Sequence, residues 1–497
     1  MGRRPFASVA VLVVVLVVVI VMALAAAACS GSGPVVVLRN EQTGTISWKP
    51  CAKIECGTLS VPLDFRTPQG KQITLALARL PARRKAIGVL FSNPGGPGGS
   101  GVDFLREADD VFPAEIRDSF DIVSWDPRGV GASAPVVCQS DLDPFYAVDH
   151  APQTAAGVAQ NVAASRAFVA ACKKNSAALL PYVSTVATAR DMDAIRAAIG
   201  APKISYVGFS YGTLLGALYA DMYPTHVRAM VLDGAVDPAR SYAASTVDQA
   251  KSFDADLNAF FTHCRTDTKC SFAHGDDPAT AYRDLARTIE EEPVPGTVAG
   301  EHRTLGPGEF DLGVASALYS GADGYDDLAS ALAEAARGVG DQMLALTDAY
   351  TGRTTGGKYS NETEGLYAIG CIDSPAPTTV AAVQQLAASA ARVAPYFGAS
   401  TVWLGLPCTF WPVPVEGEVA PIHAPAAPPI VVVGTIRDPA TPYAWAVSLA
   451  SELKSGRLLT AAGASHTSYG RGNACVDGTV DRYLLTLRVP APGTRCA

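Results

Sequence analysis

The chain has 497 residues, of which 48% are hydrophobic and 17% are charged, and its formal net charge is −8 with a pI near 5.4. This much apolar sequence can bury at least one large core, which excludes an intrinsically disordered chain. No basic surplus is available to neutralise phosphates, so nucleic acid is not expected as a partner.

The N-terminus is typical of an export signal. Arg3 and Arg4 precede an uncharged stretch over residues 9–28 that ends in alanines, which matches a basic region, an apolar region and a small-residue cleavage site. The apolar run also approaches the ~20 residues that span a bilayer, so an uncleaved membrane anchor is the alternative. Cys29, directly after three alanines, resembles the lipid-modified cysteine of a bacterial lipoprotein. Each interpretation predicts that the chain from Ser30 onward is exported, either secreted or held at the cell surface, with membrane contact only through this segment.

The number of cysteines indicates an oxidising compartment. Setting Cys29 aside leaves ten of the 11 cysteines, an even number that suits five disulfide bridges. The sequence leaves the connectivity open, but neighbouring cysteines suggest the pairs Cys51–Cys56, Cys138–Cys172, Cys264–Cys270, Cys371–Cys408 and Cys475–Cys496. No Cys-x-x-Cys and no His-x-x-x-His pattern occurs, so neither a metal site nor a cofactor is expected.

Short apolar runs alternate with helical patterns after the N-terminal segment, which predicts an α/β fold with a mostly parallel, doubly wound sheet. A helix is expected over residues 188–200, with Gly200 at its end, and it leads into the strand that precedes Ser210. The expected strands cover residues 73–80, 88–92, 120–125, 204–208, 229–233, 430–434 and 458–461.

Residues 237–428 differ from the rest of the chain. This region is rich in Ala, Asp, Glu and Gly, and its helical patterns are not separated by convincing strands. We expect a largely helical lid inserted between two parts of one core, residues 29–236 and 429–497, with residues 1–28 as the signal peptide. Within the lid, helices are predicted over residues 247–264, 277–291, 325–349 and 379–391.

The central motif is GFSYG, residues 208–212, which follows the apolar stretch ISYV and opens the helical pattern YGTLLGALYADMY. A serine between two glycines at a strand-to-helix turn is typical of a nucleophile elbow. The glycines permit a sharp turn that side chains would obstruct, and the helix N-terminus stabilises developing negative charge. Ser210 is therefore the candidate nucleophile, and the alternative is a serine that only caps the helix.

A serine hydroxyl needs a base to accept its proton. Of the seven histidines, His466 lies just past the last expected strand, in the sequence GASHTSYG. A loop at the carboxyl edge of the sheet can reach Ser210 from there. His466 is therefore the expected base, and the other six are interpreted as surface histidines.

The base needs an acid that holds its tautomer and stabilises its cation. Asp438 follows the apolar run IVVVG and precedes His466 by 28 residues, which keeps the order Ser, Asp, His. Asp233 and Asp237, after the stretch AMVLD, are alternative acids from an earlier loop. Thr441 is expected to place a hydroxyl beside Asp438.

An oxyanion hole requires free backbone N–H groups near the nucleophile. The segment NPGGPGGSG, residues 93–101, follows the apolar run GVLFS, so a glycine-rich loop is expected where this strand ends. We expect the N–H of Gly96 or Gly95 to join that of Tyr211 in binding the oxyanion. A phosphate-binding loop is the alternative, but the Lys-Ser/Thr of such loops is absent.

The motifs GFSYGT, NPGGPGGSG, SWDPRGVGAS, GTIRDPATP and ASHTSYG together resemble the secreted bacterial α/β-hydrolases related to tripeptidyl aminopeptidases and, more distantly, to prolyl iminopeptidases. The resemblance runs from about Cys51 to Cys496 and implies an α/β-hydrolase fold with a helical lid. It implies that Ser210, Asp438 and His466 form the catalytic triad. Prolyl iminopeptidases usually have His-Gly-Gly-Pro where this chain has Pro-Gly-Gly-Pro, which argues against simple proline specificity.

The chemistry of such a triad is acyl transfer. The resemblance supports an exopeptidase or narrow endopeptidase that removes short N-terminal peptides from a peptide or small protein outside the cell. Such an enzyme needs an acidic group for the substrate ammonium, and the candidates are Glu362, Glu364 and Asp373 in NETEGLYAIGCID. A carboxylesterase or lipase with the same triad is the alternative. A non-catalytic surface lipoprotein that binds peptides is a third possibility, against which the retained Ser, Asp and His argue.

Overall fold

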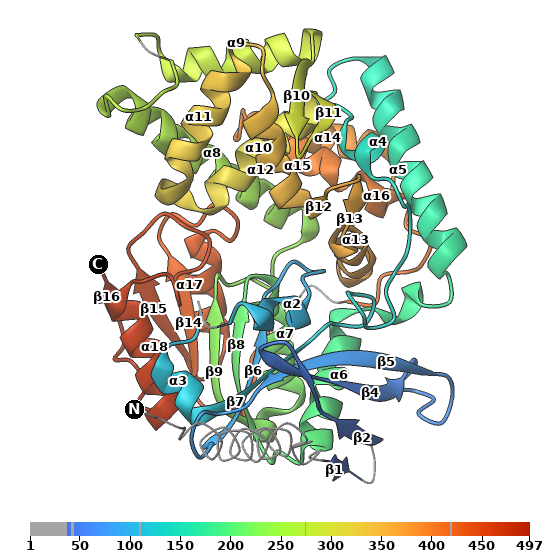
Figure 1. Cartoon of the computed structure of the whole chain (residues 1–497), viewed down its shortest axis with the longest axis vertical. Helices are drawn as coiled ribbons and strands as arrows, with labels where there is room; N and C mark the ends of the chain where they lie inside the picture. Colours follow the sequence, from blue (N-terminus) through green and yellow to red (C-terminus); the bar gives the residue numbers. More distant parts are fainter. Residues whose placement is uncertain (1–36, 41–43, 109–110, 274, 418–419) are drawn as a thin grey trace, which may run out of the picture.

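A computed structural model describes residues 37–40, 44–108, 111–273, 275–417 and 420–497. Its largest element is a ten-stranded sheet in the order β16-β15-β14-β9-β8-β6-β7-β5-β4-β3 (Figure 1). Neighbouring strands from β16 to β7 pair in parallel, and β5, β4 and β3 continue the sheet in antiparallel fashion. The mostly parallel sheet expected from the sequence is therefore confirmed.

Each of the seven strands predicted from the sequence is present, with boundaries that differ by at most two residues. β8 and β14 are buried at every position, as expected for central strands rich in Val and Ile. The strands of this sheet are β3 (Lys49–Cys51), β4 (Ile54–Pro62), β5 (Gln72–Leu80), β6 (Gly88–Asn93), β7 (Phe120–Trp125), β8 (Ile204–Phe209), β9 (Val227–Asp233), β14 (Ile430–Thr435), β15 (Gly456–Ala461) and β16 (Arg495–Cys496).

Helices cover both faces of the sheet, which makes it doubly wound. One apolar core joins the sheet to α6 (Thr185–Ile199), α7 (Tyr211–Met222) and α17 (Tyr443–Glu452). A second core on the opposite face joins it to α2 (Gly101–Arg106), α3 (Ala114–Ser119) and α18 (Ala474–Thr486). The predicted end of α6 is confirmed, because Gly200 caps it in the left-handed conformation with φ 76°.

The inserted region, which we term the cap, forms a separate layer above the sheet (Figure 1). It has an apolar core of its own, built largely from α8, α9, α10, α11 and α12. Its helices are α8 (Tyr242–Thr266), α9 (Pro278–Glu291), α10 (Pro307–Tyr319), α11 (Tyr325–Ala335), α12 (Asp341–Thr351), α13 (Glu362–Asp373), α14 (Val380–Ala391), α15 (Gly398–Leu404) and α16 (Leu406–Thr409).

The cap differs from the sequence prediction in three places. The single helix expected over residues 325–349 is two helices, because the chain turns at Gly338 with φ +82°. Helices α10, α13, α15 and α16 were not expected. The cap also contains two β-hairpins that the sequence did not predict. One pairs β10 (Val294–Val298) with β11 (Glu301–Leu305), and a shorter one pairs β12 (Arg353–Thr354) with β13 (Lys358–Tyr359).

Two helices that precede Ser210 along the chain also pack against the cap. In α4 (Asp143–Tyr146) and α5 (Ala155–Ser176), the rings of Phe145 and Phe168 lie 5.7 and 5.3 Å from that of Tyr367 in α13. The boundaries at residues 236 and 428 remain our proposal for dividing the chain.

All five disulfides expected from neighbouring cysteines are bonded. Three of them join separate elements: Cys51–Cys56 links β3 to β4, Cys371–Cys408 links α13 to α16, and Cys475–Cys496 links α18 to β16. Five bridges are consistent with export to an oxidising compartment. The signal-peptide and Cys29 lipidation predictions lie outside the described residues, within which no helix is long and apolar enough to cross a bilayer.

Candidate active site

Ser210 occupies the turn between β8 and α7, with φ 54° and ψ −125°, a conformation that non-glycine residues rarely adopt. Both neighbouring glycines are sterically required. A Cβ atom on Gly208 would lie 2.3 Å from the carbonyl oxygen of Gly212, and one on Gly212 would lie 2.8 Å from that of Asn93. The turn has the geometry expected of a nucleophile elbow.

His466 contacts Asp438 and neither of the alternative acids. Its Nδ1 lies 2.9 and 3.1 Å from the two carboxylate oxygens of Asp438. Asp233 instead accepts hydrogen bonds from the backbone N–H groups of Ser468 and Tyr469 at 2.9 and 2.7 Å, while Asp237 caps a local turn. Asp438 is thus the acid that the structure brings to His466.

The Asp438 carboxylate is held by several donors. Oδ1 accepts hydrogen bonds from the backbone N–H groups of Ala440 and Thr441 at 2.9 and 2.8 Å. Oδ2 accepts a bond from the hydroxyl of Thr441 at 2.9 Å, which is the contact expected from the sequence. Asp438 is 2% exposed and His466 is 8% exposed, so the pair is largely shielded from water.

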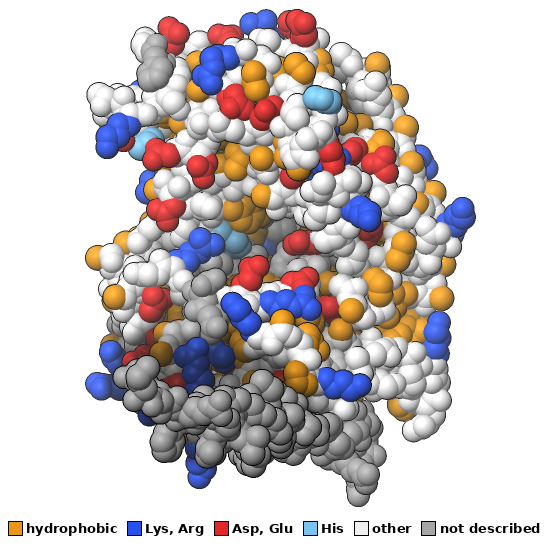
Figure 2. Space-filling model, in the orientation of Figure 1, with side chains coloured by type: hydrophobic (Ala, Val, Ile, Leu, Met, Phe, Trp, Pro, Cys, Tyr) orange, Lys and Arg blue, Asp and Glu red, His pale blue; other side chains and the backbone are white. Residues whose placement is uncertain are grey.

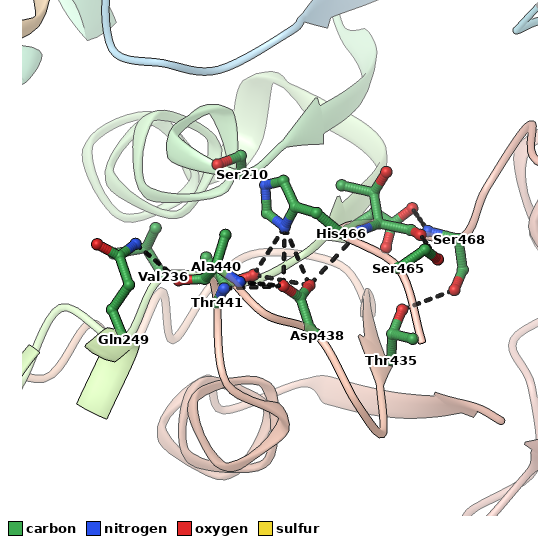
Figure 3. Close-up of polar contacts among 12 residues, drawn as sticks. Ser210, Val236, Gln249, Thr435, Asp438, Ala440, Thr441, Ser465, His466 and Ser468 are labelled. Atoms are coloured by element: carbon green, nitrogen blue, oxygen red, sulfur yellow. Dashed lines mark hydrogen bonds and ion pairs between the residues drawn. The ribbon is translucent and has the colours of Figure 1, made fainter. Parts of the chain in front are cut away.

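Ser210 and His466 meet at the end of β9. The N–H of Ser210 donates to the carbonyl of Asp233 at 2.9 Å, and a Cβ on the next residue, Gly234, would lie 3.1 Å from Cε1 of His466. Figure 3 shows Ser210 beside the edge of the imidazole that carries Nε2, opposite the edge that contacts Asp438. Nε2 is buried and has no hydrogen-bond partner within the described residues, so it remains available to accept a proton.

The glycine-rich loop after β6 lies against the elbow. A Cβ on Gly95 would lie 2.9 Å from Cβ of Ser210 and 3.3 Å from the backbone nitrogen of Tyr211. The N–H of Gly95 donates to Oδ1 of Asn93 at 3.0 Å and is therefore not available to bind an oxyanion. Of the two glycines considered from the sequence, Gly96 is the one whose N–H stays free within the described residues to act with that of Tyr211.

The three acidic candidates for an ammonium site lie on α13 but face different surroundings. Asp373 accepts a hydrogen bond from the N–H of Thr185 at 2.9 Å and also contacts the hydroxyl of Thr185. Glu364 is buried and accepts a backbone hydrogen bond from Cys138, and burial raises its pKa to about 7. Glu362 alone among the three has an exposed side chain.

Glu362 lies against the glycine-rich loop. A Cβ on Gly98 would lie 2.3 Å from the carbonyl oxygen of Glu362, so the two backbones are in close contact. Burial raises the pKa values of Tyr319 and Tyr350, and the negative charge of Glu362 raises both values further, which indicates that Glu362 lies near these two tyrosines. The ring of Tyr319 in turn contacts that of His466, with centroids 5.3 Å apart. Figure 2 shows the surface hollowed between the cap and the sheet, with both acidic and basic side chains around the hollow.

One residue that fixes this arrangement was missed in the sequence. Asn361 accepts a hydrogen bond from the N–H of Gly131 at 2.7 Å and donates to the carbonyl of Gly129 at 2.9 Å. Both glycines belong to the motif SWDPRGVGAS of the core. The motif was recognisable from the sequence, but the cap residue that binds to it was not.

Two family models match the chain: one for the alpha/beta hydrolase fold over residues 88–275, and one for TAP-like proteins over residues 394–496. The serine protease Hip1 of Mycobacterium tuberculosis is 37% identical over 476 residues, which covers 91% of each chain. The chain belongs to the TAP-like family of α/β-hydrolases. Family membership and the α/β-hydrolase fold implied by the sequence motifs are therefore confirmed.

Other relatives in this family act on different bonds, to judge by their names. The tripeptidyl aminopeptidase of Streptomyces lividans is 32% identical over 494 residues, 94% of this chain and 89% of that protein. Carboxylesterase B of M. tuberculosis is 36% identical over 474 residues, 91% and 90% of the two chains. A solved structure, the proline iminopeptidase of Mycobacterium smegmatis, matches with a TM-score of 0.37 at 12% identity and covers 86% of this chain and 97% of that one. The chain is a serine hydrolase of the TAP-like family, and the relatives include both peptidases and an esterase.

Proposed function

We propose that the protein is an exported serine aminopeptidase that releases short N-terminal peptides through an acyl-enzyme. The observation that carries the catalytic part is the contact of Asp438 with Nδ1 of His466, with Nε2 turned toward Ser210. A carboxylate can only accept hydrogen bonds, so Nδ1 holds the proton and Nε2 keeps a lone pair. His466 is then in the tautomer that a general base requires.

In the proposed reaction, Oγ of Ser210 attacks the substrate carbonyl while Nε2 of His466 takes the hydroxyl proton. The oxyanion is stabilised by the N–H groups of Tyr211 and Gly96. His466 then gives its proton to the departing amine as the C–N bond breaks. Water, deprotonated by the same nitrogen, hydrolyses the ester to Ser210 and restores the enzyme.

Glu362 supports an aminopeptidase over an esterase. Its carboxylate is the one exposed candidate among the three on α13, and it lies at the glycine-rich loop that runs past Ser210. Desolvation by the surrounding protein raises the pKa of Glu362. A cationic α-ammonium beside it favours the ionised form, so the side chain can pair with the α-ammonium of a substrate whose scissile carbonyl is at Ser210. An ester without an amino group would gain nothing from it.

The test compares a tripeptide p-nitroanilide bearing a free N-terminus with its N-acetyl form and with a p-nitrophenyl ester. We expect cleavage of the free tripeptide and weak cleavage of the acetylated one. Glu362→Gln should raise KM for the free tripeptide about tenfold, the effect of losing ~1.4 kcal/mol, and leave the ester unaffected. Glu364→Gln, on the same helix but buried against Cys138, is the matched control. Ester turnover without cleavage of any peptide would replace the proposal by a carboxylesterase.

A further inference from the structure

A turn of the cap is bonded to the loop that carries His466. The N–H of His466 donates to the carbonyl of Tyr319 at 3.0 Å, and the N–H of Ala322 donates to the carbonyl of Ala464 at 3.1 Å. Tyr319 ends α10, and Ala322 lies in the following 3₁₀ turn, Gly321–Gly324. The cap and the histidine loop therefore run side by side.

Gly321 permits this close approach. Its φ is +59°, and a Cβ on it would lie 1.2 Å from the carbonyl oxygen of Ala464. No side chain can occupy that space unless the histidine loop or the cap turn moves. The contact is therefore a backbone-to-backbone junction between two segments far apart in the sequence.

The ring of Tyr319 reinforces the junction. It stands nearly perpendicular to the His466 imidazole, at 88° with centroids 5.3 Å apart. Two other rings of the cap pack against the Tyr319 ring. The centroids of Phe253 in α8 and Tyr350 in α12 lie 5.5 and 5.6 Å from its centroid. Since the imidazole must keep one orientation to serve both Ser210 and Asp438, a rigid aromatic contact restricts its rotation.

The cap also holds the acid loop. Nε2 of Gln249 in α8 donates to the carbonyl of Ala440 at 2.8 Å (Figure 3). The N–H of the same residue, Ala440, donates to Oδ1 of Asp438 at 2.9 Å, and its side chain packs in the apolar core of the cap. Both members of the Asp438–His466 pair thus sit on loops that contact the cap.

We propose that the cap positions the catalytic pair, with Tyr319, Gly321 and Gln249 as positioning residues. The inference rests on the proposed triad. The histidine loop needs such support because Thr467, a non-glycine residue, is held at φ +67°, a conformation that persists only where surrounding contacts enforce it. Asp233 supplies contacts from the core through Ser468 and Tyr469, and the cap supplies the bond to His466 itself. The cap is accordingly part of the active site as well as its cover.

The first test compares Gly321→Ala with Gly338→Ala. Both glycines lie in the cap with positive φ, but a Cβ on Gly338 would meet no atom within 4 Å. The measurements are the rate of inactivation by a small fluorophosphonate, kcat and KM on one ester or peptide substrate, and the melting temperature. We expect Gly321→Ala to lose on the order of 100-fold in inactivation rate and in kcat, with KM nearly unchanged, because a small displacement of His466 disrupts proton transfer.

The outcomes separate this inference from the triad itself. Gly338→Ala should keep the wild-type rates. Equal rates for two folded glycine variants would overturn the positioning role and leave the triad intact, whereas a wild-type protein that resists labelling would overturn the triad. If Gly321→Ala does not fold, the positioning role is tested instead by comparing Tyr319→Leu with Tyr319→Phe. We expect kcat to fall in the Leu variant and to stay near wild type in the Phe variant, which keeps the ring. Equal kcat in these two variants would contradict the proposal.

Discussion

The carboxylate of Asp438 is bound by more donors than the imidazole alone, and the side chain of Thr441 supplies one of them. Thr441→Val keeps the shape of the side chain and removes the hydroxyl. We expect kcat to fall about tenfold, the effect of a hydrogen bond to a charged group, with KM little changed. Thr409→Val is the control, because that buried hydroxyl has no partner among the described residues. Equal kcat in the two variants would show that the hydroxyl plays no part.

The three residues of the proposed triad could be picked out in the sequence because their signals are local. Ser210 sits in a five-residue motif, and His466 and Asp438 each follow an apolar strand that the sequence displays plainly. The choice between Gly95 and Gly96 was not predictable, because it depends on where the side chain of Asn93 points. Both glycines have the same sequence context, and only the folded loop shows which N–H is already used.

At the scale of elements, Asn361 attaches the N-terminal end of helix α13 to the core, while Asp373 attaches the other end through Thr185. Asn361→Ala removes bonds to Gly131 and Gly129 and should let the first turn of the helix, with Glu362, shift. We expect KM for a free tripeptide anilide to rise severalfold while turnover of an ester stays near wild type. Steady-state kinetics on both substrates provide the measurement. A parallel loss on both substrates would show instead that α13 supports the catalytic centre as a whole.

Seven of the ten strands of the sheet and the helices α6 and α7 were predicted from the sequence, whereas α2, α3, α18 and several cap helices were not. Strand β14 reads as an unbroken apolar run, because both of its faces are buried. Helix α13 lies between the core and the rest of the cap, so eight of its 12 residues are buried on most sides. It therefore lacks the one-sided apolar stripe by which a helix is recognised. The three acidic candidates on α13 could not be ranked for the same reason, since ranking them requires knowing which way each faces.

At the scale of the whole molecule, the disulfide Cys475–Cys496 joins helix α18 to β16, the strand at one edge of the sheet. It closes a loop of 21 residues and holds the two-residue strand β16 against β15. Replacing both cysteines by serine should lower the free energy of unfolding by ~3 kcal/mol. Thermal melts of the oxidised wild type and the double variant provide the measurement. An unchanged melting temperature would mean that the strand is held by its hydrogen bonds alone.

The pH dependence of stability should follow the buried carboxyls of the cap. Burial raises the pKa of Asp311 to about 8 and the pKa values of Glu364 and Asp373 to about 7. The folded protein therefore binds these protons more tightly than the unfolded chain. This stabilisation is complete below the unfolded pKa values near 4 and is lost as the pH rises toward 8.

Melting temperatures measured from pH 4.5 to pH 8.5 test this expectation. The melting temperature should fall with rising pH, and Asp311→Asn should flatten the fall, because the amide cannot ionise. The control is Asp327→Asn, at an exposed position without an ion pair among the described residues, where loss of the charge should leave the slope unchanged. An identical slope in wild type and Asp311→Asn would contradict the assignment.

The account as a whole depends on Ser210 being activated by His466 and Asp438. The most direct measurement is the intact mass of the purified protein before and after treatment with a fluorophosphonate, with Ser210→Ala and His466→Ala alongside. We predict a single adduct on the wild type, none on Ser210→Ala and greatly slowed labelling of His466→Ala. A folded wild-type protein that takes up no adduct, or one that is labelled equally after Ser210→Ala, would contradict the account.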